Sequence, residues 1–228
     1  ENDLISYNNG KSELNVGDVI LIPNLYKTVD TVSNNVTYSY AVARGIDISD
    51  YQVDIDWDRV KETSDYVIVE VAREPRNYID NIGSYIEECT NQIINVVNND
   101  ISLGLYFCIS SDMKVSVYEE RLDEYFSILN TEMKDNGVEL NRGNIPVFLD
   151  FEEYYSGNDY YRLMEVFEQK CLENGFSKVG IYGNGHTLSL INDSLVKNGE
   201  HTDLNDTNWY VWKSGGPQYS TNEKLSYD

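Results

Sequence analysis

Histidine and cysteine are scarce in this 228-residue chain, and each scarcity argues against a class of site. The two histidines, His186 and His201, are too few and too far apart for a zinc motif. The three cysteines, Cys89, Cys108 and Cys171, lie within apolar patterns, which favours buried free thiols over a disulfide framework or a metal site. The sequence therefore predicts no metal ion and no cofactor.

Positive charge is scarce too. The chain has 17 lysine and arginine residues against 39 aspartate and glutamate residues, which gives a net charge of −22. Such a chain repels phosphate groups, which argues against nucleic acid and against anionic membranes as partners. No apolar run is long enough to span a membrane, and no signal peptide is visible. The chain begins at Glu1 rather than methionine, so we expect it to be part of a longer protein.

The remaining composition is that of a folded protein. Apolar residues make up 41% of the chain, which excludes a disordered acidic tail, and the length suits one large domain or two small ones. Tyrosine is abundant at 19 copies. A tyrosine ring can stack on a sugar while its hydroxyl forms a hydrogen bond, but at this abundance most tyrosines must serve the surface or the core.

Three segments differ in their patterns. Residues 1–26 contain a short helical stretch, then a Val-Gly-Asp turn leading to a strand closed by Ile-Pro-Asn, and resemble the rear half of a LysM repeat. LysM modules bind glycans that contain N-acetylglucosamine, although half a repeat cannot form the whole binding surface; a simple hairpin is the alternative. Residues 27–40 are rich in Thr, Ser, Asn and Val without a helical period, which predicts a linker. We expect a new domain over residues 41–228.

Strand and helix patterns alternate through this domain. Strands are expected at 44–49, 66–72, 102–110, 146–153, 178–182 and 209–213, and amphipathic helices at 78–97, around 118–133 and around 163–171. Such alternation imposes right-handed parallel crossovers, so the fold class is α/β, either a barrel or a doubly wound sheet. No glycine-rich phosphate loop follows any strand, which favours the barrel.

The stretch Pro146–Glu153 ends a buried apolar strand in carboxylates. Side chains alternate across a strand, so Asp150 and Glu152 share one side, with Cβ atoms roughly 6–7 Å apart. Two carboxylates at this spacing can perturb each other's pKa, as acid–base chemistry at a glycosidic bond requires. A helix N-cap or a solvated strand end is the alternative.

Barrel enzymes carry their active residues at the carboxyl ends of several strands. The residues expected there are Asp47, Glu70 with Arg73, Tyr106, Asp150 with Glu152, and Tyr182. A rim of acids and tyrosines suits a carbohydrate better than a phosphorylated substrate, which would favour arginine, lysine or helix N-termini.

These residues resemble those of family-25 glycoside hydrolases, the Chalaropsis-type muramidases of phages, bacteria and fungi. The resemblance rests on Gly45–Gln52 (GIDISDYQ), Pro146–Glu152 (PVFLDFE), Gly180–Tyr182 (GIY) and Trp209, in the order that the family has. It implies an irregular TIM-like β/α barrel with five β/α units and three further strands. It also implies hydrolysis of the β-1,4 bond between N-acetylmuramic acid and N-acetylglucosamine in peptidoglycan, at the cell wall or in a phage particle.

The resemblance assigns roles by position. Glu152 matches the general acid, which must hold a proton near neutral pH, and Asp150 and Asp47 match the neighbouring acids. Five residues match substrate-binding positions: Tyr106, Tyr182, Tyr51, Gln52 and Trp209. The spacing of the carboxylates leaves the anomeric outcome open, because N-acetyl sugars also permit substrate-assisted catalysis.

The chain departs from the family pattern in three respects that matter. Residues 209–213 read Trp-Tyr-Val-Trp-Lys, where the family has Trp-x-Ala-x-Tyr. Glu70 and Arg73 follow the second strand, where smaller or differently charged groups are expected, and we expect them to pair with each other. The chain also ends at Asp228, before the family's last two strands, which predicts an open barrel.

Two other functions fit parts of the sequence. The first is a non-catalytic glycan-binding or structural barrel in a phage-tail-like or cell-wall assembly, favoured by the open barrel. The second is a chitinase, which would need an Asp-x-Asp-x-Glu strand and has Phe148 at the first of these positions.

Overall fold

The structure, a computed structural model, describes residues 22–23, 26–33, 36–41, 44–74, 82–109, 112–152, 159–199, 201 and 203–214. Residues 1–21, which carry most of the LysM-like segment, lie outside the described residues. The short closing strand of that segment is described as β1 (Ile22–Pro23), and it pairs antiparallel with the first strand of the predicted barrel, where Ile22 faces Gly45.

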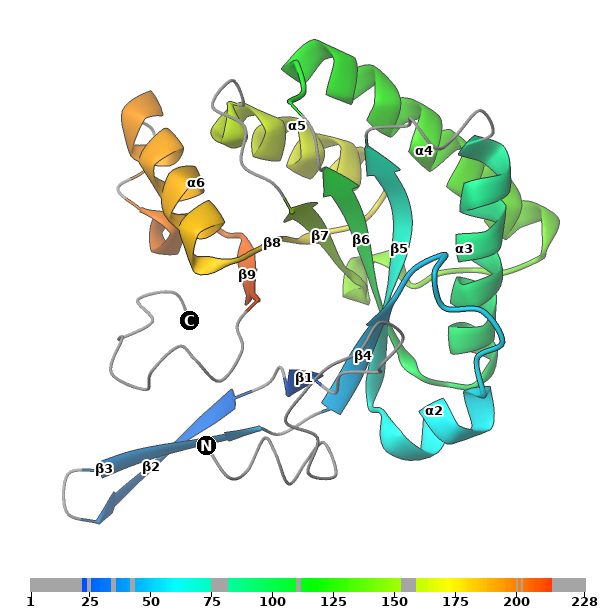
Figure 1. Ribbon diagram of the computed structural model, residues 1–228, viewed down its shortest axis with the longest axis horizontal. Coiled ribbons are helices and arrows are strands. Elements are labelled where there is room, and N and C mark those ends of the chain that lie inside the picture. The colour runs from blue at the N-terminus through cyan, green and yellow to red at the C-terminus, as the bar shows by residue number, and fades with distance from the viewer. Residues whose placement is uncertain are drawn as a thin grey trace.

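The main sheet has the strand order β1-β4-β5-β6-β7-β8-β9, and β4 to β9 are parallel neighbours in chain order. These parallel strands are β4 (Arg44–Ile48), β5 (Tyr66–Glu74), β6 (Ser102–Ile109), β7 (Pro146–Phe151), β8 (Lys178–Gly183) and β9 (Tyr210–Lys213). They curl into a half-barrel, as Figure 1 shows. The predicted α/β class and irregular TIM-like β/α barrel are confirmed.

The helices lie along the outside of the curled sheet (Figure 1). They are α2 (Trp57–Thr63), α3 (Ile82–Asn98), α4 (Val115–Asp135), α5 (Tyr160–Glu173) and α6 (Gly185–Asn198). The Asp159 side chain caps α5 by accepting a hydrogen bond from the backbone N–H of Arg162, and α5 ends at Asn174-Gly175, the predicted stop. Gly175 has φ +85°, a left-handed conformation that favours glycine and turns the chain back toward β8.

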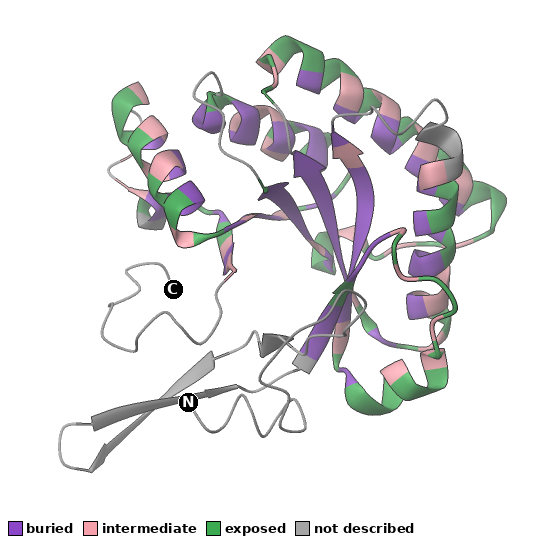
Figure 2. Cartoon of the chain, viewed as in Figure 1, coloured by how far each residue is buried: buried purple, intermediate pink, exposed green. Residues whose placement is uncertain are grey.

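Strands β5 to β8 are largely buried on both faces, which explains their continuous apolar sequences (Figure 2). The larger apolar cluster fills the space between the sheet and the helices and includes Val69, Phe107 and Leu149. A smaller cluster covers the concave face and consists of Ile68, Tyr106, Cys108, Phe148 and Trp212, with Tyr66 and Tyr182 packed against it. The second cluster matters for function because it is the floor of the barrel mouth.

Three parts of the structure differ from the sequence-based expectation, and the first is helix α2, which was not predicted. The predicted linker at residues 27–40 contains a two-stranded antiparallel hairpin of β2 (Tyr26–Ser33) and β3 (Val36–Ala41). Helix α6 was not predicted, although Leu188, Ile191 and Leu195 are buried at steps of three and four. Asn184 caps this helix by accepting a hydrogen bond from the backbone N–H of Thr187.

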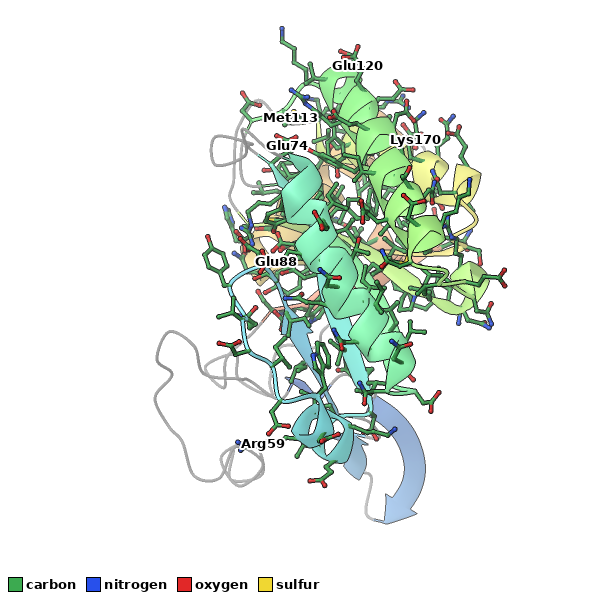
Figure 3. The ribbon with its side chains drawn as sticks, turned by 90° about the vertical axis from the view of Figure 1, so that its right-hand side faces the viewer. Arg59, Glu74, Glu88, Met113, Glu120 and Lys170 are labelled. Carbon is green, nitrogen blue, oxygen red and sulfur yellow. The ribbon has the colours of Figure 1, made fainter. Side chains whose placement is uncertain are left out.

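The helical layer presents acidic side chains to the outside. Figure 3 views helices α3 and α4 from outside and labels Glu88 on α3 and Glu120 on α4, both of which are exposed. Lys170 on α5 forms an ion pair with Asp123 on α4 at 2.8 Å. Within the described residues, no helix is both long enough and apolar enough to cross a membrane.

Gly180 offers a test of the concave packing. A Cβ atom at Gly180 would lie 2.6 Å from the carbonyl oxygen of Tyr210 and 2.7 Å from the Phe148 ring, so β9 and the ring would both have to move. We expect Gly180→Ala to lower the free energy of unfolding by about 1–3 kcal/mol, the usual cost of overpacking. Gly143→Ala is the matched control, because its new Cβ would meet nothing nearer than Ser177 Oγ at 3.9 Å. Chemical denaturation measures both, and equal stabilities of the two variants would contradict this packing.

Candidate active site

A β-bulge in β5 shapes the site. In a regular strand, residues three apart face opposite sides of the sheet. The pairing of β5 with β6 shifts by one residue between Glu70 and Ala72, so that Glu70 is opposite Tyr106 while Arg73 is opposite Cys108. Both Glu70 and Arg73 therefore face the concave side.

Arg73 links two carboxylates there. Its Nε lies 2.9 Å from Glu70 Oε1, and its Nη2 donates a 3.4 Å hydrogen bond to Glu70 Oε2. Its Nη1 donates a 2.7 Å hydrogen bond to Glu152 Oε2, across from β5 to the end of β7. The expected Glu70–Arg73 pair is confirmed, and it is extended to Glu152.

Glu70 is the most enclosed of these acids, with 0% of its surface exposed. Tyr106 donates a 3.2 Å hydrogen bond to Glu70 Oε2. Burial raises the pKa of Glu70 from 4.5 to about 7, against the opposing attraction of Arg73. The buried Glu70 carboxyl, which contacts the Arg73 guanidinium and the Tyr106 hydroxyl, therefore fixes the position of Arg73.

One row of side chains crosses five strands of the concave face. The strand registers place Arg73, Cys108, Asp150, Tyr182 and Trp212 side by side, in that order. Asp150 lies at the centre of the row with 4% of its surface exposed, and its Oδ1 has no hydrogen-bond partner among the described residues. Burial, reinforced by the neighbouring carboxylates of Glu152 and Glu70, raises the pKa of Asp150 well above its ordinary value.

Glu152 follows Asp150 on the same side, as the alternation predicts. Its backbone N–H donates to the carbonyl of Ile109, so the residue continues the pairing of β7 with β6. Its side chain is 42% exposed, whereas Asp150 is enclosed. Cys108, Asp150 and Glu152 each bring a ligand-type atom within 4.8 Å of the others, which makes them the residues that could hold a metal ion in the described part of the chain.

Asp47 on β4 completes the set of acids. Its neighbours Ile46 and Ile48 pack into the larger core, so Asp47 faces the concave side. Its charge contributes to the raised pKa values of Asp150 and Tyr182, which places the three groups in one electrostatic unit. Desolvation also raises the pKa of Asp47 itself, and a backbone hydrogen bond partly opposes that rise.

Aromatic rings border the acids on the β8–β9 side. Trp212 lies 4.5 Å from Tyr182 and 6.4 Å from Tyr106 between ring centroids, both in edge-on geometry. Trp212 Nε1 is buried and has no hydrogen-bond partner among the described residues. An open pocket of ≈ 320 Å³ adjoins them, lined by Phe151, Glu152, Tyr182, Asn184 and Ser214. The site thus combines carboxylates, aromatic rings on which a ligand could stack, and an open pocket.

Three residues assigned to substrate binding from the sequence lie outside the row of side chains formed by Arg73, Cys108, Asp150, Tyr182 and Trp212. Trp209 packs against Tyr161 on the helical side and donates a 2.9 Å hydrogen bond to Glu168. Gln52 accepts hydrogen bonds from Ser49 and so holds the turn after β4. Tyr51, in the same turn, is 73% exposed.

The structure also brings in two side chains that sequence reasoning left out of the site, Cys108 and Trp212. The signal for Cys108 was its two-residue step from Tyr106, which places both on one face of β6. The signal for Trp212 was the same step within β9, but choosing it over Trp209 requires the register with Tyr182.

Comparisons with known proteins agree with the fold. No protein-family model matches the chain, and no curated protein sequence matches it. Among solved structures, it is similar to the spore cortex lytic enzyme SleM of Clostridium perfringens, with a TM-score of 0.56 and 14% identity over 80% of this chain. The shared feature is the fold. The match covers 56% of SleM, so this chain spans little more than half of that protein.

A second solved structure is more distant. Fructose-bisphosphate aldolase of Plasmodium falciparum matches with a TM-score of 0.48 and 12% identity, over 75% of this chain and 57% of that chain. This score is too low to support an inference about the chain.

The raised pKa of Glu70 predicts a pH-dependent stability. Between the unfolded value of 4.5 and the folded value of about 7, Glu70 is ionised when unfolded and protonated when folded, so stability falls as pH rises through this window. The loss is on the order of 3 kcal/mol at 1.36 kcal/mol per pKa unit. We expect Glu70→Gln to flatten the pH dependence of the free energy of unfolding in this window. Glu120→Gln, on the outer face, should keep the wild-type slope, and a Glu70→Gln slope as steep as wild type would contradict the assignment.

Proposed function

We propose that this protein is a peptidoglycan hydrolase of the cell wall or of a phage particle. It cleaves the β-1,4 bond between N-acetylmuramic acid and N-acetylglucosamine, with Glu152 as the general acid. Glycan strands are its partner, and it acts outside the cytoplasm. The resemblance to family-25 muramidases and the fold shared with a cortex lytic enzyme both support a wall polysaccharide as substrate.

The observation that carries the proposal is the placement of three acids on one concave face. Asp47, Asp150 and Glu152 come from the carboxyl ends of two parallel strands, the place where barrel enzymes act. They differ in environment, since Asp150 is enclosed while Glu152 is exposed beside the pocket. Two neighbouring carboxyl groups in unlike environments are the arrangement that glycoside hydrolysis uses.

In this mechanism the carboxyl pair handles one proton. Asp150 and Glu152 lie within 4.8 Å of each other, so a proton held by the buried Asp150 carboxyl can be passed to the exposed Glu152 carboxylate. Glu152 gives it to the glycosidic oxygen, the bond from that oxygen to the sugar carbon breaks, and the carboxylates left behind stabilise the cationic sugar. Water then adds to that carbon and returns a proton to the pair.

The aromatic rings fit the substrate. Tyr182 is half-buried at the pocket, where its ring can lie against a sugar face. The unpartnered Trp212 Nε1 and Asp150 Oδ1 supply a donor and an acceptor on the same row. Sugar hydroxyls can satisfy both kinds of group.

One observation favours the alternative, a non-catalytic glycan-binding or structural module. Glu152 is held in an ion pair with Arg73, and a carboxylate in that pair accepts hydrogen bonds rather than donating a proton. For catalysis the approaching glycan must draw Glu152 away from Arg73. A module that only binds glycans would keep the ion pair between Arg73 and Glu152 intact.

Substitution of the acid tests the proposal. We expect Glu152→Gln to slow the clearing of purified cell walls by at least about 100-fold, the usual scale of general acid catalysis. Glu120→Gln removes an exposed glutamate from the outer face of α4 and should clear walls at the wild-type rate. Turbidity and released reducing ends are the measurements, and undiminished clearing by Glu152→Gln would exclude this residue as the acid.

Wall binding separates the enzyme from the module. Sedimentation with intact walls should bring down Glu152→Gln as well as wild type, because the amide keeps the shape of the site. Tyr182→Ala should bind more weakly by roughly 1–3 kcal/mol, the scale of a lost aromatic stacking contact with a ring. Binding by the wild type without any release of reducing ends would favour the non-catalytic module.

A further inference from the structure

The cluster of Cys108, Asp150 and Glu152 has a feature that hydrolysis does not need. Hydrolysis uses the two carboxylates, whereas Cys108 contributes a sulfur atom within 4.8 Å of them. Cys108 is buried on the concave face, directly opposite Asp150 in the register of β6 and β7. The other two cysteines, Cys89 and Cys171, lie in the larger core behind the sheet.

The charge around this cluster is unbalanced. Asp47, Glu70, Asp150 and Glu152 share the concave face, and in the described part of the chain Arg73 is the cation in ion-pair contact with any of them. Arg73 is already engaged with Glu70 and Glu152, so Asp150 is left without a cationic partner in contact. A cation placed between Asp150 and Glu152 would reduce the repulsion among the acids.

A second observation points to a ligand at this place. Asp150 is enclosed, with 4% of its surface exposed, yet its Oδ1 lacks a hydrogen-bond partner among the described residues. A buried polar atom without a partner costs free energy, so it calls for an explanation in a water, an ion or a substrate group. The sulfur of Cys108 faces the same space, and sulfur is a weak hydrogen-bond donor.

We propose that Cys108, Asp150 and Glu152 form a binding site for a thiophilic divalent cation of the zinc type, with the fourth position open to water. Thiolate with carboxylates suits zinc, whereas magnesium and calcium prefer oxygen ligands alone. Around tetrahedral zinc, bond lengths of about 2.0–2.3 Å set the ligand atoms about 3.3–3.6 Å apart. Ligand atoms within 4.8 Å need a small contraction, which the exposed Glu152 side chain allows.

The cation would act as an inhibitor of the proposed hydrolysis. On binding, the Cys108 thiol loses its proton to solvent, and a metal–sulfur bond takes the place of the S–H bond without any change of oxidation state. The metal would then be coordinated by the Asp150 and Glu152 carboxylates, which could no longer deliver the proton to the glycosidic oxygen. This regulatory part rests on the proposed function, whereas the binding site itself does not.

Cobalt binding tests the site without reference to lysis. Co²⁺ substitutes for zinc and shows a sulfur-to-metal charge-transfer absorption in the near ultraviolet only when a thiolate is a ligand. We expect the metal-free wild-type protein to develop this band with one Co²⁺ per chain, and Zn²⁺ but not Mg²⁺ to abolish it. Cys108→Ser should lose the band, and Cys171→Ser, which alters a buried thiol behind the sheet, should keep it.

Glu152→Gln is the second variant, because its exposed side chain can change without disturbing the core. We expect it to weaken Co²⁺ binding by at least about 10-fold, a loss typical of impaired metal coordination. The proposed site would be overturned by the absence of the band in the wild type or by an unchanged band in Cys108→Ser. It would also be overturned if Cys171→Ser lost the band while its circular dichroism showed an intact fold. If the wild type clears walls, Zn²⁺ should slow its rate of clearing at least about tenfold, and a chelator should restore that rate. Binding without that fall would overturn the inhibition alone.

Discussion

The ion pair between Glu70 and Arg73 is the constraint on which the site depends. A carboxylate at 0% exposure is costly without a partner, and breaking such a buried pair costs about 3–5 kcal/mol. The pair exists because a bulge turns both residues to the same side of β5. Since the same guanidinium also holds Glu152, the bulge in one strand decides where the carboxylate at the end of another strand is placed.

Much of the fold could be predicted because the sheet is parallel and covered by helices. Strands buried on both faces are continuous apolar runs, and the covering helices show apolar steps of three and four, so both periods are visible in one sequence. The hairpin of β2 and β3 lacks the continuous apolar run of a fully buried strand, since its strands mix valine and tyrosine with threonine and serine. Helix α6 could have been found from Asn184, its buried leucine and isoleucine steps, and Gly199 at its end.

The acids of the site and the Glu70–Arg73 pair were predictable, but the contact of Arg73 with Glu152 was not. Asp47, Asp150 and Glu152 follow apolar strands, so parallel topology alone places them at one end of the sheet. The bulge has no glycine or proline to mark it, because its residues are Glu70, Val71 and Ala72. The choice of Trp212 over Trp209 depends on a register between β8 and β9 that a single sequence does not contain.

The concentration of carboxylates on the concave face would let one site serve both the proposed hydrolysis and the proposed metal ion. In the part of the chain that the structure describes, four acids share one guanidinium in contact, so they favour any positive charge that reaches them. A proton on Asp150, the cationic sugar of the proposed hydrolysis and a divalent metal ion would each meet that requirement. Cys108 adds a sulfur ligand that only a metal ion would use, because neither the proton nor the sugar cation is stabilised by a thiolate. The same electrostatic excess that would stabilise the transition state of hydrolysis therefore exposes the site to competition from a metal ion.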